Sequence, residues 1–318
     1  MVSRVTTLLL PTSMTDDPTT PPDVRVVRYD VTEPVPDDAL DADALVLWGN
    51  GRDQMADAAR RLTRLRWVQT LAAGPDAALA AGFADDVVIT SGRGLHDGPV
   101  AEHTLALVLA AARRLPDLVR AQSEHRWADE LGGMPDPDAG PAFRTLDGAR
   151  VLVWGFGSIA GRLAPLLTAL GAQVTGVATT AGDRGGFPVI STFSLPDHLP
   201  QTDVLICLLP ATEQTRHAID ADVLDLLPRH AWVVNVGRGT TLDEAALLDA
   251  LRSDRLAGAA LDVFETEPLP ADSPLWDEPR VLVSPHAAGG RPIGAGDLVT
   301  ANLTAFLAGG QLRNVVAR

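Results

Sequence analysis

Short runs of apolar and β-branched residues alternate along this chain with longer segments of helical character. Such alternation is typical of parallel sheets that helices cover on both faces, so the pattern predicts an α/β fold. Strands are expected in the first third of the chain and again after residue 150, where they suffice for a complete dinucleotide-binding sheet. The predicted strands are residues 6–10, 24–29, 44–48, 67–70 and 86–89, followed by 151–154, 173–177, 203–208, 232–236, 258–262 and 280–283.

A long helix is predicted from residue 98 onward. Gly98 and Pro99 are suited to the N-cap and N1 positions, and Glu102 in the first turn complements the helix dipole. The residues that follow, as far as Leu115, are small or apolar on most sides. A helix of this composition is predicted to be buried.

The end of the chain has helical periodicity over residues 295–307, and the pair Gly309 and Gly310 that follows is typical of a helix end. Residues 132–141, which are rich in glycine, proline and aspartate, are predicted to form a loop.

Composition narrows the classes of partner. The chain has 318 residues, 46% of them hydrophobic, and is long enough for two domains with separate apolar cores. Its formal charge is −15, and all of its positive charge is arginine because no lysine occurs. The electrostatic field of a negatively charged protein repels polyanions and anionic lipid headgroups, so neither nucleic acid nor a membrane surface is an expected partner.

The compartment is predicted from the N-terminal segment and the single cysteine. The apolar run at residues 5–10 contains two threonines and ends at Pro11, which is too short for a secretory signal or a spanning helix. Cys207 lies within an apolar run, which suits a core position in a reducing cytosol, although a reactive thiol is the minor alternative. We therefore expect a cytoplasmic protein. The histidines show no ligand spacing with carboxylates or the cysteine, so no metal is expected.

A glycine-rich turn joins the strand at 151–154 to a helical segment. The motif Gly-x-Gly-x-x-Ala places Gly155 at the tight turn, Gly157 where backbone amides approach a pyrophosphate, and Ala160 where helix and strand pack closely. Free amides and the helix dipole then hold the anion. The alternative is a strand-to-helix turn whose glycines serve packing alone, but the flanking strand and helix favour a cofactor.

The strand at 173–177 is followed by the residues expected to meet the adenosine ribose. The usual acidic residue is missing there, and Ala178, Thr179 and Thr180 follow Val177. A carboxylate would repel a 2′-phosphate, so its absence favours NADP, with the two threonines and Arg184 as donors to that phosphate. The alternative is an ordinary polar loop and weaker binding of NAD.

Three further segments place chemically active side chains just past candidate strands, where ligands bind in open α/β sheets. Arg238 lies on a glycine-flanked turn, and its planar guanidinium is able to clamp a carboxylate through two hydrogen bonds. Glu267 follows the strand at 258–262, and His286 follows the last strand. Taken singly, each is more often a solvated surface group than a functional one.

Together the motifs resemble the D-isomer-specific 2-hydroxyacid dehydrogenase family, and the resemblance covers nearly the whole chain. The main motifs are Gly-Phe-Gly-Ser-Ile-Ala at 155–160, Asn-Val-Gly-Arg-Gly at 235–239, Leu-Asp-Val-Phe-Glu-Thr-Glu-Pro at 261–268 and Ser-Pro-His-Ala-Ala-Gly at 284–289. In addition, the Ala-Ala-Gly-Pro-Asp segment at 72–76 is similar to the family's substrate loop.

The resemblance implies the catalytic roles. His286 would donate the proton to a 2-oxo acid during reduction, and Glu267 would orient the imidazole and favour its charged form. Arg238 would polarise the carbonyl and bind the carboxylate, with the amides of Ala73 and Gly74 completing the anion site. The residues expected to contact the cofactor are Gly155, Phe156, Gly157, Ser158, Ile159, Thr179, Thr180, Arg184, Leu209, Pro210, Thr215, Val236, Gly237, Asp262 and Ala288.

The resemblance also implies domains and assembly. It implies a discontinuous flavodoxin-like substrate domain at 1–97 and 290–318, and a Rossmann dinucleotide-binding domain at 98–289. Family members are usually homodimers joined through their nucleotide domains, so a homodimer is expected here.

Differences from particular branches of the family reduce the number of candidate substrates. The formate-oxidising branch has glutamine at the position of Glu267, and the phosphite branch relies on a lysine in the substrate loop, whereas this chain has no lysine. The D-lactate enzymes use a tyrosine near the substrate, but the only tyrosine here, Tyr29, lies in an early predicted strand. What remains resembles the glyoxylate and hydroxypyruvate reductases. The alternative is a non-catalytic, dinucleotide-responsive binding protein like the corepressors related to this family.

Overall fold

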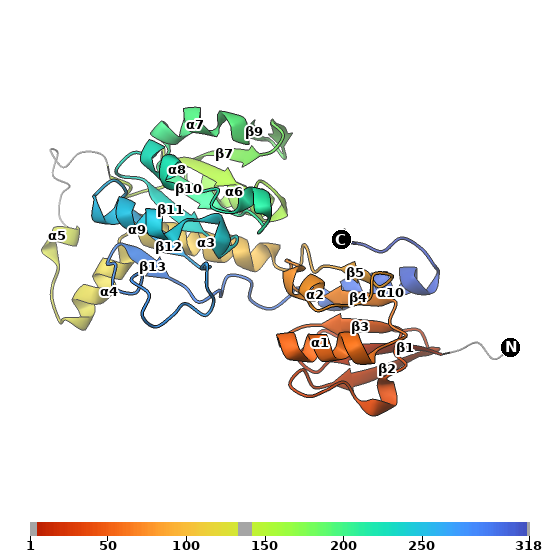
Figure 1. The fold of residues 1–318 in the computed structure, drawn as a ribbon. Coiled ribbons are helices and arrows are strands. Elements are labelled where there is room, and N and C mark those ends of the chain that lie inside the picture. The colour runs from red at the N-terminus through yellow and green to blue at the C-terminus, as the bar shows by residue number, and fades with distance from the viewer. Residues whose placement is uncertain (1–4, 133–141, 317–318) are drawn as a thin grey trace. The chain divides into compact units, whose positions relative to one another are not determined.

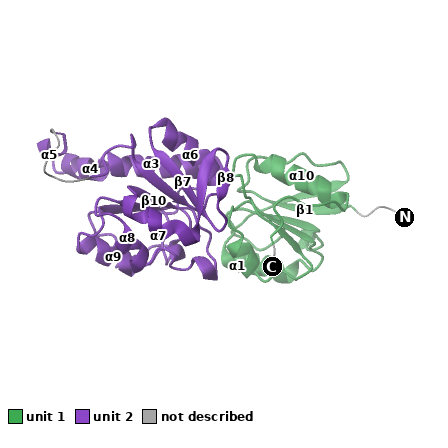
Figure 2. Cartoon of the chain, turned by 90° about the horizontal axis from the view of Figure 1, so that it is seen from above, with its two compact units in different colours: residues 1–96, 291–318 green, residues 97–290 purple. Residues whose placement is uncertain are grey.

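The computed structural model describes residues 5–132 and 142–316 and divides the chain into two compact units. Unit 1 contains residues 1–96 and 291–318, and unit 2 contains residues 97–290 (Figures 1 and 2). Each unit contains its own sheet, and we describe the two separately.

Unit 1 is built on a fully parallel sheet with the strand order β2-β1-β3-β4-β5. This is the order of flavodoxin-like folds. The prediction of five strands is confirmed, with the fifth displaced toward the C-terminus. The strands are β1 (Thr6–Pro11), β2 (Val24–Tyr29), β3 (Ala44–Leu47), β4 (Trp67–Thr70) and β5 (Val88–Thr90), and the helices between them are α1 (Arg52–Arg61) and α2 (Asp76–Ala80).

The tail of the chain also belongs to unit 1. The predicted helix is confirmed as α10 (Ala295–Leu307), which packs on Leu8, Leu10 and Trp67. The glycine pair ends it as expected, because Gly309 has φ +65° and the Gly310 amide donates to the Ala305 carbonyl at 2.8 Å. The last described residues then run along β5, where the amide of Val316 donates to Ile89 O at 2.9 Å.

Unit 2 contains a larger sheet with the order β13-β12-β11-β10-β6-β7-β9-β8. The strands β9, β7, β6, β10, β11 and β12, in this spatial order, have the Rossmann order 3-2-1-4-5-6. Strand β13 adds a further parallel strand next to β12. The bounds are β6 (Arg150–Trp154), β7 (Gln173–Ala178), β8 (Gly182–Arg184), β9 (Phe187–Ser191), β10 (Val204–Cys207), β11 (Trp232–Asn235), β12 (Gly258–Leu261) and β13 (Val281–Val283).

Two strands of this sheet, β8 and β9, were not expected from the sequence. They form an antiparallel hairpin at the sheet edge, joined by Gly185 and Gly186, which have φ +65° and +86°. Pro188 within β9 weakens the strand pattern, because proline lacks the amide hydrogen that a central strand donates. An edge strand tolerates it, since one side of β9 pairs only with the short β8.

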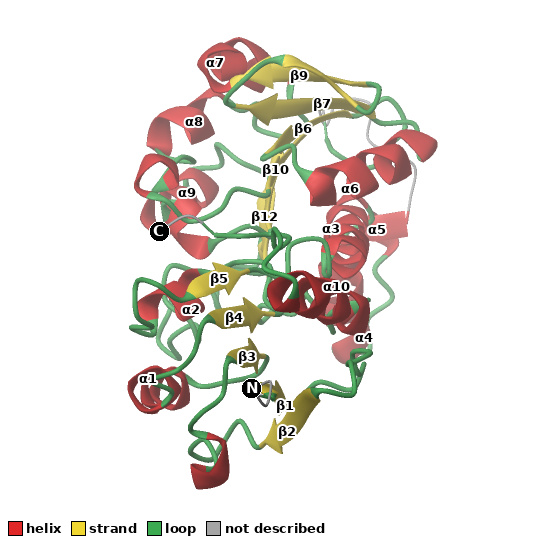
Figure 3. Cartoon of the chain, turned by 90° about the vertical axis from the view of Figure 1, so that its right-hand side faces the viewer, coloured by secondary structure: helices red, strands yellow, loops and turns green. Residues whose placement is uncertain are grey.

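Helices cover both faces of the unit 2 sheet, as Figure 3 shows for α3 and α6 on one side and α8 and α9 on the other. Alternating side chains of β6 separate the two cores: Val151 and Val153 pack with α3 and α6, and Leu152 and Trp154 with α8 and α9. The helices are α3 (Asp97–Ala112), α4 (Leu115–Ser123), α5 (Asp129–Gly132), α6 (Ser158–Ala169), α7 (Leu195–His198), α8 (Ala221–Leu226) and α9 (Glu244–Arg252).

The long buried helix differs from its prediction at both ends. It begins at Asp97, so Gly98 and Pro99 lie inside its first turn rather than at the N-cap and N1 positions. It ends at Ala112, because Arg114 adopts a left-handed conformation with φ 52° and starts α4 in a new direction. The predicted loop at 132–141 lies outside the described residues except for Gly132, which ends α5.

Short 3-10 turns complete the described structure at Asp37–Ala39, Thr192–Ser194, Leu199–Gln201, Glu213–Thr215 and Gly239–Thr241. Within residues 5–132 and 142–316, no helix has the length and apolarity that crossing a bilayer requires.

Candidate active site

The turns after three neighbouring strands of unit 2 are packed directly against one another. Gly155, after β6, has φ +101°, and a Cβ atom there would lie 2.7 Å from the carbonyl oxygen of Leu208. At Gly237, after β11, a Cβ atom would lie 2.6 Å from the carbonyl oxygen of Leu209. Both distances are shorter than real Cβ contacts, so glycine is required at both positions. These contacts gather the turns after β6, β10 and β11 at one edge of the sheet.

The turn after β6 has the features of a phosphate-binding site. Gly157 is the N-cap of α6, and no side chain caps the helix, which leaves its first amides without a side-chain acceptor. Among the described residues other than Gly157 and its two sequence neighbours, no heavy atom lies within 4 Å of a Cβ built on Gly157. Ser158 is exposed and Ile159 half-buried at the helix start, while Phe156 is buried against Gly176. The free helix N-terminus and the open space beside it fit a pyrophosphate.

The residues expected at the ribose end lie directly after β7 and on β8, and Arg184 contacts the turn after β6. Arg184 donates from Nη1 to the carbonyl oxygen of Phe156 at 2.7 Å, and from Nη2 to that of Thr180 at 3.2 Å. Thr179, Thr180 and Arg184 are all exposed. The neighbouring acid, Asp183, accepts a hydrogen bond from the Gly186 amide within the β8–β9 hairpin. The segment from the end of β7 to β8 therefore exposes an arginine and two threonines to solvent.

The loop after β10 is ordered by its own polar groups. Thr215 Oγ1 donates to the carbonyl oxygen of Pro210 at 2.6 Å, and Thr212 and Thr215 form a capping box at Glu213–Thr215. Next to this loop, Val236 is buried, and its amide donates to Cys207 O at 3.1 Å. Leu209, Pro210, Thr215, Val236 and Gly237 thus lie on adjoining turns.

The turn that carries Arg238 is held by two buried polar residues. Asn235 accepts from the Gly237 amide at 3.1 Å and donates from Nδ2 to the carbonyl oxygen of Arg238 at 3.2 Å, and Thr241 donates to that oxygen at 2.6 Å. The guanidinium itself donates from Nη1 to Gly237 O at 2.7 Å. The roles of Asn235 and Thr241 were not predicted from the sequence. The signal for Asn235 is a polar side chain at the end of an apolar strand, and that for Thr241 is a hydroxyl two residues after the Gly-Arg-Gly turn.

Cys207 lies behind the same turn, with its Sγ 3.3 Å from the hydroxyl of Thr241. Burial raises the pKa of the Cys207 thiol, so the thiolate is disfavoured. The core interpretation of this cysteine agrees with its burial, and the reactive alternative does not.

The Arg238 turn is in contact with the segment that carries Glu267. Gly239 packs so closely on the backbone of Phe264 that a Cβ atom would lie 1.9 Å from it. The amide of Phe264 in turn donates to Glu267 Oε1 at 3.0 Å. Arg238 and Glu267 therefore come from segments whose backbones touch.

Glu267 and His286 form a hydrogen-bonded pair at the edge of the sheet. Glu267 Oε2 lies 2.7 Å from Nδ1 of His286, and the side chains are 34% and 49% exposed. In the described parts of the chain, no side chain or backbone group hydrogen-bonds the other ring nitrogen, Nε2. An imidazole held through Nδ1 by a carboxylate, with Nε2 available, is suited to proton transfer.

Asp262 supports the turn on which His286 lies. It is 1% exposed and accepts three hydrogen bonds, from Ser284 Oγ at 2.6 Å and from the amides of Ala287 and Ala288 at 2.8 and 3.0 Å. The backbone amide of His286 donates to Asp262 O at 2.8 Å. The predicted contact of Asp262 with a nicotinamide stays a prediction, whereas its support of this turn is a geometric fact.

The two remaining predicted residues lie in unit 1. Ala73 and Gly74 are half-buried in the turn between β4 and α2. The backbone amide of the preceding residue, Ala72, donates a hydrogen bond to Thr70 Oγ1 at 3.2 Å, and its carbonyl oxygen accepts one from the Gly92 amide at 2.8 Å. Their proposed contact with substrate stays a prediction.

Comparison with known proteins agrees with these features. Residues 105–288 match the family model described as D-isomer specific 2-hydroxyacid dehydrogenase, NAD binding domain. The chain is 33% identical over 298 residues to glyoxylate/hydroxypyruvate reductase A of Salmonella newport strain SL254, covering 89% of this chain and 87% of the reductase.

Solved structures give the same result. A D-isomer specific 2-hydroxyacid dehydrogenase from Xanthobacter autotrophicus Py2, in complex with NADPH and MES, superposes with a TM-score of 0.79 at 31% identity, covering 99% of this chain and 98% of the other. An NADPH-dependent glyoxylate/hydroxypyruvate reductase from Sinorhizobium meliloti, in complex with NADP and sulfate, gives 0.78 at 26% identity, covering 98% of both chains. The relatives named as reductases favour an enzyme over a non-catalytic binding protein. The chain belongs to the D-isomer specific 2-hydroxyacid dehydrogenase family and is an NAD(P)-dependent oxidoreductase.

Proposed function

We propose that this enzyme reduces small 2-oxo acids of the glyoxylate and hydroxypyruvate class to D-2-hydroxy acids, with NADPH as the preferred reductant and His286 as the proton donor. The observation that carries the proposal is the His286–Glu267 pair, in which Nδ1 of His286 lies 2.7 Å from Oε2 of Glu267. The Arg238 turn touches the segment that carries Glu267. The names of the matched reductases support the substrate class.

The reaction adds a hydride to the carbonyl carbon and a proton to the carbonyl oxygen. When bound, the reduced nicotinamide supplies the hydride. As negative charge grows on the oxygen, His286 donates its Nε2 proton, and the carboxylate of Glu267 stabilises the imidazolium before transfer. In the reverse direction the neutral imidazole takes the proton from the hydroxyl group, so one residue acts as donor and acceptor.

Arg238 serves substrate binding. Its guanidinium offers paired N–H donors that match a carboxylate, and the bonds from Asn235 and Thr241 to its carbonyl oxygen keep the turn in place. A donor beside the ketone oxygen also stabilises the negative charge that develops there. We propose that Arg238 does both.

The residues after β7 and on β8 support a preference for NADPH. Arg184, Thr179 and Thr180 are exposed next to the turn of Phe156, and the nearby acid, Asp183, is engaged in the hairpin. A guanidinium there attracts a 2′-phosphate. The structural relatives from Xanthobacter and Sinorhizobium hold NADPH and NADP respectively, which supports the same choice.

Steady-state oxidation of NADPH and of NADH, followed at 340 nm, tests the function with glyoxylate, hydroxypyruvate, pyruvate and longer 2-oxo acids. We expect turnover with glyoxylate and hydroxypyruvate. We also expect a kcat/KM at least about tenfold higher with NADPH than with NADH, because one charge-assisted hydrogen bond to the 2′-phosphate contributes a free energy of that size. Binding of the cofactor without turnover of any 2-oxo acid would overturn the proposal in favour of a dinucleotide-responsive binding protein.

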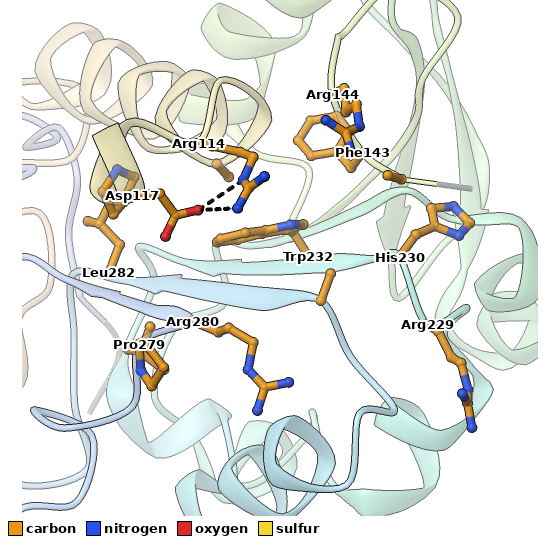
Figure 4. Close-up of a pocket in the computed structure, with 15 residues that line it drawn as sticks. Arg114, Asp117, Phe143, Arg144, Arg229, His230, Trp232, Pro279, Arg280 and Leu282 are labelled. Carbon is orange, nitrogen blue, oxygen red and sulfur yellow. Dashed lines mark hydrogen bonds and ion pairs between the residues drawn. The ribbon is translucent and has the colours of Figure 1, made fainter. Parts of the chain in front are cut away.

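We further propose a cytoplasmic homodimer joined through unit 2. The segment after α3 exposes large apolar side chains, with Val119 59% and Trp127 88% exposed. Beside it lies a hollow of about 400 Å³, where Figure 4 shows Arg114 paired with Asp117 near Trp232. None of Arg238, Glu267 and His286 lines this hollow. An apolar surface of this kind is typical of a protein interface.

Sedimentation equilibrium checks the assembly. We expect a mass of twice 33.5 kDa for the parent and a shift toward the monomer for Val119→Glu, because a buried unpaired carboxylate opposes association. Phe193→Glu is the matched control, since Phe193 is 95% exposed on another element of unit 2. A monomeric parent would contradict the dimer.

A further inference from the structure

Behind the turn of His286 lies a polar side chain that the proposed mechanism does not use. His103, on α3, places Nε2 2.9 Å from Ser284 Oγ and 3.3 Å from Asp262 Oδ1. Ser284 and Asp262 are buried, and the side chain of His103 is 27% exposed. A histidine from α3 thus reaches the network that holds the catalytic turn.

The direction of the hydrogen bonds in this network follows from counting protons. Asp262 is an acceptor when ionised, so the single hydroxyl proton of Ser284 is donated to Oδ1, 2.6 Å away. The Ser284 oxygen then has only lone pairs left for His103. Nε2 of His103 must therefore carry a proton and donate it to Ser284.

The network fixes the His286 turn from both sides. Ser284 precedes the histidine, Ala287 and Ala288 follow it, and all three donate to the one carboxylate of Asp262. His286 itself has φ 52°, in the left-handed region that residues other than glycine adopt less often. The bonds of its neighbours to Asp262 hold the turn in this conformation.

We propose that His103 is a positioning residue for the reaction: its Nε2–H donor orients the Ser284 hydroxyl toward Asp262 and so holds the catalytic imidazole of His286 in place. The proposal rests on the proposed function in so far as His286 transfers the proton. It also makes a statement about the free protein, namely that the setting of the His286 ring depends on His103. That statement is testable without any turnover.

Three variants test the proposal. His103→Leu keeps the bulk and removes the donor, whereas His103→Gln keeps an N–H donor at a similar reach. Ser284→Ala removes the middle group and serves as the second test where His103→Leu does not fold. The matched control is His230→Leu, because His230 also pairs through Nε2 with a carboxylate, Asp203 at 2.7 Å, and is 20% exposed.

Kinetics of the holoenzyme provide the first measurement. We expect His103→Leu and Ser284→Ala to lower kcat about tenfold, the effect of one lost buried hydrogen bond, with KM for glyoxylate and the Kd of NADPH within about twofold. His103→Gln restores kcat to within about threefold, and His230→Leu leaves it unchanged. An unchanged kcat in folded His103→Leu, or no rescue by glutamine, overturns the proposal.

NMR of the free protein with labelled histidine rings separates this inference from the proposed function. The His286 signal is assigned by its loss in His286→Gln. We expect it to shift or broaden in His103→Leu and to stay in place in His103→Gln and His230→Leu. An unmoved signal in His103→Leu refutes the positioning role whether or not the parent turns over, whereas a shifted signal with an inactive parent retains it and refutes only the proposed activity.

Discussion

Replacing His286 with alanine will lower kcat for reduction of glyoxylate by about 10³-fold or more, which lies within the range that positioned acid–base groups contribute. The alanine removes the only group of the Glu267–His286 pair that carries a transferable proton. Water is then the remaining donor, and it has no fixed position beside the carbonyl oxygen. Stopped-flow and steady-state rates with saturating NADPH measure the effect.

Cofactor affinity is the control for this variant. The turns expected to hold the cofactor begin at Gly155, Leu209 and Val236, and their contacts with one another do not include the imidazole. The Kd of NADPH, from quenching of protein fluorescence, should therefore remain within about twofold of the parent. Equal rates in the variant and the parent would contradict the role of His286.

Replacing Arg238 with alanine will raise KM for the 2-oxo acid and lower kcat together, with kcat/KM reduced by about 10²–10³-fold. Two charge-assisted hydrogen bonds to the carboxylate are lost, and each contributes about 1.5–3 kcal/mol. The loss of kcat follows because the same guanidinium stabilises charge on the ketone oxygen in the transition state.

Lysine at position 238 separates charge from geometry. Arg238→Lys retains the charge but not the paired planar donors, so we expect it to recover only part of the lost kcat/KM. Arg252→Ala, at the exposed end of α9, is the control and should behave like the parent. An unchanged KM in Arg238→Ala would count against the carboxylate clamp.

Much of the fold followed from local patterns. Most parallel strands of both sheets are rich in apolar residues and are bounded by polar or glycine-rich segments, and burial on both faces of the central strands makes such runs conspicuous. The helix at Ala295–Leu307 was predicted with its bounds, because its periodicity and its glycine stop agree. The motifs around Gly155, Arg238 and His286 were visible for the same reason: each follows such a strand directly.

Features that depend on tertiary contacts were missed. The β8–β9 hairpin contains a proline and has its own glycine turn at the sheet edge, so neither its pattern nor its length indicated strands. The partners of Asp262 come from a segment more than twenty residues away, and no spacing rule connects them to His103 on α3. Asn235 and Thr241 acquire their roles only once the Arg238 turn folds between them.

We propose that this enzyme transfers a hydride to the carbonyl carbon of a 2-oxo acid and yields the D-hydroxy acid. The most direct test supplies hydroxypyruvate and NADPH that carries deuterium at both C4 positions, and examines the product by mass spectrometry and chiral chromatography. We expect D-glycerate with one deuterium at C2. Glycerate without deuterium at C2, or with the L configuration, would contradict it.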